Sequence, residues 1–425
     1  MTWTSVSPWD GQPVWRGVEE DPHPASAGLT GLADVPARRA ALERFAAVLT
    51  ARRAEAVDLL IREAGKVRAD AEAEADLLPA KIAVTLDAGW RRCPPEPQDG
   101  IHWRPRGLAV VLGPYNFPLH LLHGLVVPAL AMGNPVVAKP SERTPALGAW
   151  YRQAAQDAGL APHLGVVLGG AAVAAALVAD LRVATVAAVG GRAMGQALSR
   201  ALADRPEVVL ALELGGIGHA LICDDASVAA AAPVLAEGAW RMAGQRCNAT
   251  RIVHVPRQRL GEFQEALEQE RRRWMPGTDP AGLAGPMIDV GQRDRFLAGV
   301  ASFAPGQACH HAAVEPILAV ATGWSANLQR EHFGPLLVLL PYDQDASALE
   351  RLVANPYRLS ATVWTPDPTR FDHWAARLPY GLVGWNRSTS GARADRPFGG
   401  CGLSGNGHPA GVAAVSIFAD ETVRW

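Results

Sequence analysis

Short apolar runs rich in valine alternate with helical patterns along most of this chain, and this rhythm constrains its fold more than any other feature. The first group of runs comprises Leu108–Gly113, Pro135–Pro140, Leu164–Gly170, Val183–Gly191 and Val208–Gly216. Helical patterns lie between them, as over Thr144–Ala158 and Ala193–Ala203. Strand, helix and strand at this spacing predict a parallel, doubly wound α/β sheet, in which ligands bind at the carboxyl ends of the strands.

A second α/β unit is expected after Asp224, because 425 residues exceed what one ordinary core accommodates. Its strand candidates are Arg251–Val255, Gly334–Tyr342 and Leu359–Pro366. From Pro36 to about Trp90, apolar residues recur three and four positions apart, which predicts helices. The last stretch, "VAAVSIFADETVRW", is strand-like and can extend a sheet in a neighbouring subunit.

Charge and composition exclude several classes of function. The formal net charge of −2 gives no electrostatic basis for binding nucleic acid or an anionic membrane. The five cysteines are far apart, and His310 and His311 beside Cys309 have no further ligand at metal-binding spacing, so we expect neither a disulfide framework nor a metal site. The start lacks a signal-peptide pattern and the longest apolar run, Val166–Ala179, is too short to span a bilayer, so we expect a cytoplasmic protein.

One cysteine has polar neighbours. Cys247 lies between an arginine and an asparagine in "AGQRCNATR", whereas a structural cysteine prefers apolar surroundings. Cationic or hydrogen-bonding neighbours favour the thiolate, so we expect Cys247 to be a nucleophile with a lowered pKa.

Two further residues follow predicted strands. Glu213 in "LELGG" ends an apolar run, where burial would raise the carboxyl pKa and suit it to act as a general base. Asn116 in "GPYNFP" follows another run and can donate to a developing oxyanion. Taken singly, a paired strand-end glutamate and a turn asparagine are the commoner roles.

Two other motifs suit a nucleotide. In "VVAKPSE", a strand leads into Lys139, and the carboxylate of Glu142 can accept the hydroxyls of a ribose. In "AVGGRAMG", the glycines Gly190, Gly191 and Gly195 lie between a strand and a helix whose N-terminus can accept phosphate. A thiol, an amide donor, a carboxylate base and a nucleotide-binding half on one chain match oxidation of an aldehyde through a thioester.

The chain resembles the aldehyde dehydrogenase superfamily, and within it the succinylglutamic semialdehyde dehydrogenases. The motifs "GPYNFP", "KPSE", "LELGG", "AGQRC", "EHFGP", "NPYRLS", "GWNR" and "PFGGCGLSGN" occur in family order. They extend from about residue 10 to the C-terminus. The resemblance implies NAD as cofactor, an aldehyde as substrate, arginine catabolism as the pathway, and a homodimer or homotetramer.

The resemblance also assigns roles to individual residues. Cys247 is the nucleophile, Glu213 activates the deacylating water, and Asn116 donates to the oxyanion with the backbone N–H of Cys247. The residues implied for the cofactor are Lys139 and Glu142 at the adenosine ribose, Gly190, Gly191 and Gly195 at the pyrophosphate, and Glu331 and Phe333 at the nicotinamide end. Those implied for the substrate are Tyr115, Asn248 and Phe398 along the tunnel. A dicarboxylate semialdehyde would also need a cationic anchor, and the candidates are Arg246, Arg387, Arg393 and Arg396, of which we choose Arg387, although a solvated loop charge is the commoner role.

The implied domains are an NAD-binding domain over 1–90 and 107–222, a catalytic domain over 223–410, and oligomerisation strands over 91–106 and 411–425. Two departures from the family pattern bear on the cofactor: "VGG" at Val189–Gly191 replaces Thr-Gly-Ser, and "GGIGH" at Gly215–His219 replaces "GGNNP". Two alternatives therefore stay open. One is an enzyme for another aldehyde in a biosynthetic pathway, and the other is a non-catalytic homologue that serves as a binding or scaffold module.

Overall fold

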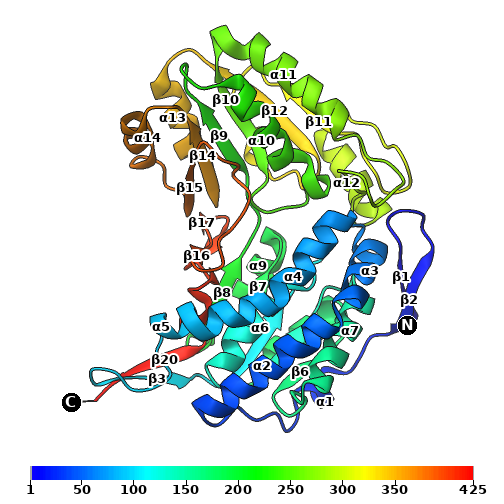
Figure 1. The fold of residues 1–425 in the computed structure, drawn as a ribbon, viewed down its shortest axis with the longest axis vertical. Helices are drawn as coiled ribbons and strands as arrows, with labels where there is room; N and C mark the ends of the chain where they lie inside the picture. The colour runs from blue at the N-terminus through cyan, green and yellow to red at the C-terminus, as the bar shows by residue number, and fades with distance from the viewer. Residues whose placement is uncertain (1, 425) are drawn as a thin grey trace.

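Two six-stranded sheets organise the computed structural model, which describes residues 2–424 (Figure 1). The first sheet has the order β18-β8-β7-β4-β5-β6, and all its strands except β18 are parallel. Its strands are β4 (Leu108–Leu112), β5 (Val136–Lys139), β6 (Leu164–Val166), β7 (Val183–Val189), β8 (Val209–Glu213) and β18 (Gly405–Asn406). The predicted doubly wound α/β sheet is confirmed.

The strands of this sheet are apolar throughout because both faces are covered. Along β4, Ala109 and Val111 pack into one core cluster, whereas Val110 and Leu112 pack into another. The first cluster lies under α2 (Val35–Ala51), α3 (Arg53–Ala64), α4 (Arg68–Val84), α6 (His120–Ala131) and α7 (Pro145–Asp157). The second lies under α8 (Ala171–Ala179) and α9 (Arg192–Ala201).

Local signals set the bounds of these helices. Asp34 accepts a hydrogen bond from the Ala37 backbone N–H at 2.7 Å, and a proline follows at the first turn, so α2 begins there. Gly65 ends α3 with a φ of 69°, a conformation that glycine adopts without strain. A π-helical turn over Thr85–Gly89 and the short α5 (Trp90–Arg92) then complete the predicted helical region.

The second sheet has the order β11-β12-β10-β9-β14-β15 and is parallel. Its strands are β9 (Gly218–Ile222), β10 (Thr250–Pro256), β11 (Ile317–Val320), β12 (Leu336–Tyr342), β14 (Ser360–Trp364) and β15 (Leu382–Trp385). Its helices are α10 (Val228–Trp240), α11 (Leu260–Arg273), α12 (Val290–Val300), α13 (Asp345–Ala354) and α14 (Pro368–Ala375). β9 belongs to this sheet although it begins before residue 223, where the second domain was expected to start.

Smaller elements lie around the two sheets. They are α1 (Pro22–Ser26) and the pairs β1–β2 (Thr2–Val6 with Pro13–Val18), β13–β17 (Tyr357–Arg358 with Cys401–Gly402), β16–β19 (Pro397–Phe398 with Ala410–Gly411) and β3–β20 (Ile101–Pro105 with Ala419–Val423). The β3–β20 ribbon projects from the body (Figure 1). The strand-like C-terminal stretch is therefore a strand only in part, since α15 (Ala414–Ile417) precedes β20.

None of the helices within residues 2–424 combines the length and apolar character needed to cross a membrane. The same residues contain no group of three or more histidine, cysteine or acidic side chains that could hold a metal ion.

A buried pair of histidines accounts for one departure from the family pattern. His219, the last residue of "GGIGH", lies on β9 and its Nδ1 is 2.9 Å from Nε2 of His254 on β10. Both side chains are fully buried, and the other nitrogen of each ring has no hydrogen-bond partner among residues 2–424. His219 therefore belongs to the core of the second sheet, not to the wall of a cofactor site.

This pair should make the fold sensitive to acid. Burial lowers the pKa of His219 to about 3 and also lowers that of His254, whereas an unfolded histidine titrates near 6.5. The neutral pair thus stabilises the fold fully above pH 6.5 and loses this contribution as pH falls toward 3, by up to about 1.4 kcal/mol per pH unit for each histidine. Urea unfolding at pH 7.5 and 5.0 should show a smaller loss in the double variant His219→Gln, His254→Gln than in wild type.

The control for this comparison is His373→Gln, because His373 is exposed on α14. It should lose as much stability as the wild-type protein between the two pH values. An equal loss in the double variant would show that other groups carry the acid sensitivity.

Candidate active site

A cavity of about 550 Å³ lies where the carboxyl edge of the first sheet meets the amino edge of the second. The ends of four parallel strands supply one wall through Leu112, Lys139, Val189 and Glu213. Residues that precede β10 and β12 supply the other, namely Cys247, Glu331 and Phe333. The strand ends of the first sheet thus border a cavity at the edge where a doubly wound fold is expected to bind its ligand.

The structure brings most of the predicted site residues together on this cavity. Those that line it are Tyr115, Asn116, Lys139, Glu142, Gly190, Gly191, Glu213, Cys247, Glu331 and Phe333. Gly195 lies one turn into α9, where a Cβ atom would come within 2.8 Å of the Leu214 side chain. Asn248, Arg387 and Phe398 lie outside the lining.

A tight turn presents Cys247. Residues 242–244 precede it and all have positive φ angles, of 57°, 50° and 63°. The guanidinium group of Arg251 donates to the carbonyls of Gly244 and Gly334, and so ties this turn to the segment that carries Glu331. Gly216 packs against the turn, since a Cβ there would lie 2.2 Å from the carbonyl oxygen of Cys247. These contacts hold the thiol in place.

The thiol of Cys247 is not a stabilised thiolate, contrary to our expectation from its neighbours. Burial raises its pKa well above the usual value, and the carboxylates of Glu213 and Glu331 raise it further. Arg246 does not compensate, because its Nη2 donates to the carbonyls of Glu237 and Gly238 at 2.9 and 3.3 Å. The resting group is a neutral thiol, so reaction requires a base that accepts its proton.

Glu213 meets the requirement for such a base. It is the last residue of β8, its side chain is buried, and neither carboxyl oxygen has a hydrogen-bond partner among residues 2–424. Burial raises the pKa of Glu213 to about 8, the Cys247 thiol opposes this shift, and the charge of Glu331 adds to it. A buried, unpartnered carboxyl with this pKa beside a thiol suits proton transfer near neutral pH.

Two N–H donors are available beside the thiol. The side-chain amide of Asn116 donates to the carbonyl of Gln245 at 2.9 Å, which fixes the amide and leaves its second N–H free. The backbone N–H of Cys247 has no acceptor within the described chain. A preorganised pair of this kind can stabilise an oxyanion.

A buried ion pair that the sequence analysis missed supports the loop carrying Asn116. Glu74 accepts hydrogen bonds from the backbone N–H groups of residues 119 and 120 at 3.0 and 2.9 Å, and its other oxygen lies 2.8 Å from Nζ of Lys66. The Lys66 ammonium also lies 4.2 Å from the ring centroid of Phe117. In the sequence, the only sign of this ion pair is a set of charged residues at helical spacing, and such residues usually lie on the solvent-exposed face of a helix.

The nucleotide side of the cavity has polar and apolar parts. Nζ of Lys139 donates to the carbonyls of Pro140 and Gly169 at 3.0 and 2.7 Å and lies 3.6 Å from Glu142, whose carboxylate is half-exposed. Gly191 precedes α9 without a side-chain cap, so the first N–H groups of α9 stay available to an anion. The apolar part is lined by Ala171, Ala174, Val178, Leu198 and Ala201. This combination fits a nicotinamide dinucleotide.

The far end of the same cavity contains Glu331 and two aromatic rings. Oε1 of Glu331 accepts a hydrogen bond from the backbone N–H of Gly216 at 2.9 Å, and burial raises the pKa of Glu331 to about 7. The rings of Tyr115 and Phe333 meet edge to face, with centroids 6.1 Å apart. This end of the cavity lies next to Cys247, so a flat ring of a ligand bound there would lie near the thiol.

The three remaining substrate candidates lie elsewhere. Asn248 is buried, and its carbonyl accepts a hydrogen bond from the Thr389 hydroxyl at 2.8 Å. Phe398 is buried on β16. Arg387 is exposed and forms no ion pair with any residue from 2 to 424.

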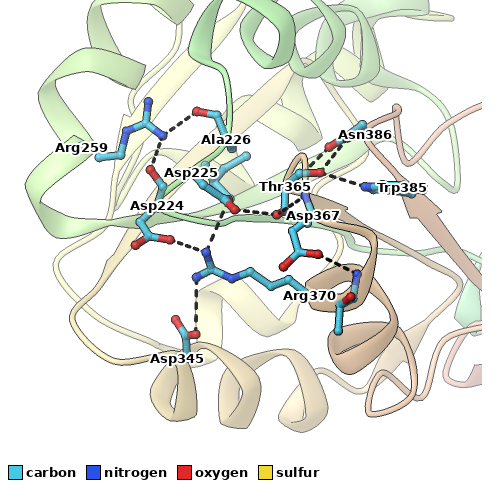
Figure 2. A network of polar contacts seen from close by, with 12 residues as sticks. Asp224, Asp225, Ala226, Arg259, Asp345, Thr365, Asp367, Arg370, Trp385 and Asn386 are labelled. Atoms are coloured by element: carbon cyan, nitrogen blue, oxygen red, sulfur yellow. Dashed lines mark hydrogen bonds and ion pairs between the residues drawn. The ribbon is translucent and has the colours of Figure 1, made fainter.

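The carboxyl edge of the second sheet is closed by its own side chains (Figure 2). Arg370 forms ion pairs with Asp224, Asp225 and Asp345. The hydroxyl of Thr365 donates to Asp225 at 2.9 Å. These contacts join the loops after β9 and β14, so this edge is held by internal ion pairs, whereas the first sheet opens onto the cavity.

A thiol, a buried carboxyl group and an amide donor thus lie together beside one cavity. The model of the aldehyde dehydrogenase family matches residues 25–422, and the chain belongs to this family. Its members couple the oxidation of an aldehyde to reduction of a nicotinamide cofactor. The resemblance expected from the ordered motifs is confirmed.

Individual relatives narrow the comparison. N-succinylglutamate 5-semialdehyde dehydrogenase 1 of Caulobacter vibrioides is 36% identical over 428 residues, which cover 95% of this chain and 90% of the relative. The structure of gamma-glutamyl-gamma-aminobutyraldehyde dehydrogenase from Burkholderia cenocepacia is 26% identical, with a TM-score of 0.91 over 100% of this chain and 92% of its own. Indole-3-acetaldehyde dehydrogenase, solved in complex with NAD+, is 26% identical, with a TM-score of 0.89 and coverage of 100% and 93%.

Proposed function

We propose that this enzyme oxidises N-succinylglutamate 5-semialdehyde to its carboxylic acid with NAD+, through a thioester on Cys247, as a step of arginine catabolism. The observation that carries the reaction is the placement of Cys247, Glu213 and Asn116 on one cavity. The substrate rests on the name of the similar relative from Caulobacter vibrioides.

The chain's own groups perform most of the chemistry. The carboxylate of Glu213 accepts the thiol proton of Cys247 as sulfur bonds to the aldehyde carbon. The amide of Asn116 and the backbone N–H of Cys247 donate to the resulting oxyanion, an effect of roughly 3 kcal/mol for one such donor. When bound, the nicotinamide supplies the hydride acceptor.

Glu213 then completes the cycle. After hydride loss, the acyl group is held as a thioester on Cys247. Glu213 first releases the thiol proton to solvent. Its carboxylate then removes a proton from water, which adds to the thioester carbon, and the sulfur leaves as the carboxylic acid forms and recovers a proton from Glu213. Because Glu213 has no other hydrogen-bond partner among the described residues, its oxygens are available to the water.

The preference for NAD+ over NADP+ rests on Glu142. Its half-exposed carboxylate on the cavity wall repels a 2′-phosphate and can accept hydrogen bonds from ribose hydroxyls. We also propose that residues 1–90 and 107–222, without β9, form the NAD-binding domain, that β9 and most of 223–410 form the catalytic domain, and that the projecting β3–β20 ribbon joins subunits of a cytoplasmic homodimer or homotetramer.

The function is tested by NADH formation from purified protein with an aldehyde panel. The panel contains N-succinylglutamate 5-semialdehyde, its uncharged analogue pentanal, and two shorter semialdehydes, each with NAD+ and with NADP+. The highest kcat/KM is expected for the succinylated substrate with NAD+. A higher value for another aldehyde would support the biosynthetic alternative, and lack of turnover together with lack of NAD+ binding would support the non-catalytic one.

Arg387 is proposed to bind a distal carboxylate of the substrate. Arg387→Ala should raise KM for N-succinylglutamate 5-semialdehyde roughly 3- to 10-fold, because exposed charge pairs contribute modestly, and should leave kcat unchanged. Steady-state kinetics with pentanal supply the comparison, since KM for pentanal should not change. Arg273→Ala on α11 is the matched control, and an unchanged KM in Arg387→Ala would remove this role.

A further inference from the structure

Arg143 lies on the cavity wall but has no role in the motif assignments. It follows Glu142 in the turn between β5 and α7 and lines the 550 Å³ cavity. Its Nη1 donates to Asp289 at 2.8 Å, and its guanidinium carbon lies 4.9 Å from the ring centroid of Tyr115. Asp289 caps α12 of the second domain, so the side chain of Arg143 crosses the cleft between the two halves.

The guanidinium group retains unused donors. Its Nε and Nη2 form no hydrogen bond with any residue from 2 to 424, and its side chain is a quarter exposed. Lys139, the other basic residue on the lining, directs its ammonium to two backbone carbonyls and Glu142. Arg143 is therefore the cation on the lining that can donate to a new partner.

Apart from Lys139 and Arg143, the ionisable side chains named on the cavity lining are acidic, so a bound diphosphate needs a cation to offset its charge. Three carboxyl side chains, those of Glu142, Glu213 and Glu331, line the same cavity. A dinucleotide brings two negative charges in its diphosphate group, which add to the charge of whichever of these carboxyl groups are ionised. At the start of α9, Gly191 supplies no hydroxyl, so side-chain donors for that diphosphate must come from elsewhere on the wall.

We propose that Arg143 binds the diphosphate of the dinucleotide, donating through its free Nε and Nη2, a role that rests on the proposed function. The ring of Tyr115 and the carboxylate of Asp289 hold the guanidinium plane, which reduces the conformational entropy lost on binding. A planar guanidinium matches two phosphate oxygens at once, which an ammonium does not.

The test is a ligand series measured by calorimetry on the full-length protein. Adenosine, AMP, ADP and NAD+ are titrated into wild type and Arg143→Gln. Dissociation constants for ADP and NAD+ should rise roughly 10- to 100-fold in the variant, as expected for loss of a charge-assisted bidentate contact, while that for adenosine stays unchanged. Equal affinities of wild type and variant for ADP and NAD+, or a parallel loss for adenosine, would overturn the proposal.

Two further variants distinguish binding of the diphosphate by Arg143 from a role of Arg143 in holding the two domains together. Asp289→Asn keeps the guanidinium and removes its carboxylate partner, so ADP should bind as tightly as in wild type or more tightly. Weakening equal to that of Arg143→Gln would assign Arg143 to holding the domains together. Arg295→Gln, an exposed arginine on α12 outside the lining, should leave every affinity unchanged. Failure of wild type to bind NAD+ would instead overturn the proposed function.

Discussion

Replacing Cys247 by alanine should abolish NADH formation from every aldehyde that the wild-type protein oxidises. The loss should reach roughly 10⁴-fold or more, because removal of a covalent nucleophile leaves only binding and oxyanion stabilisation. Alanine removes the half-buried thiol without adding volume, so the turn held by Arg251 should remain intact. The measurement is NADH absorbance with saturating NAD+ and N-succinylglutamate 5-semialdehyde.

Two controls make this result specific. Cys401→Ala removes an exposed thiol outside the cavity and should keep wild-type activity. Cys247→Ala should still bind NAD+ in calorimetry, which shows that the cofactor site has survived. Aldehyde-dependent NADH formation that persists in Cys247→Ala would rule out the thioester mechanism.

Replacing Glu213 by glutamine should slow the first turnover, because the thiol proton loses its acceptor, and should slow the following turnovers further, by roughly 10²- to 10⁴-fold, the usual contribution of a general base. Glutamine cannot deprotonate water, so the thioester on Cys247 should accumulate. Rapid mixing should show NADH up to about one equivalent per site followed by a slow phase, and intact-protein mass spectrometry should detect the acyl group. Steady turnover at the wild-type rate would assign the base elsewhere.

The pH dependence gives an independent signature of Glu213. The base is active when ionised, so wild-type kcat should rise through a pKa of about 8 and Glu213→Gln should lack this rise. The raised pKa also destabilises the fold as pH increases from 4.5 through 8, since the unfolded carboxyl ionises first. Glu213→Gln should therefore be at least as stable as wild type at pH 8.5, so that its lost activity is not due to unfolding.

Much of the fold could be predicted because its strands are buried on both faces and are continuously apolar. Three strands of the second sheet were not predicted. β11 and β15 lie at its edges and are only partly buried, and β9, with the sequence "GHALI", begins with glycine and contains a histidine, so periodicity did not mark them as strands. His219 is tolerated on β9 because His254 accepts or donates one hydrogen bond in the core. That partner lies on a different strand, 35 residues further along, and no local pattern indicates it.

Some features of the candidate site could likewise be predicted from the sequence, and others could not. Residues inside motifs, such as Cys247 and Asn116, lie on the cavity as predicted, but the charge state of the thiol was wrong. An adjacent arginine in sequence implied a thiolate, whereas the side chain of Arg246 turns toward the carbonyls of α10. Glu74 and Arg143 were missed because their roles come from partners that only the folded chain brings near them.

The pairing of β18 with β8 has a consequence for the order in which the chain is assembled on the ribosome. Gly405 lies opposite Glu213, and the side chain of Asn406 bonds to the backbone on both sides of Ala211. Translation delivers β8 long before β18, so the first sheet has an open edge while the second domain is being synthesised. The backbone of Glu213 can therefore pair with β18 only after residue 406 has emerged from the ribosome. A prematurely terminated chain would contain Cys247 but would lack the strand that pairs with the backbone at Glu213.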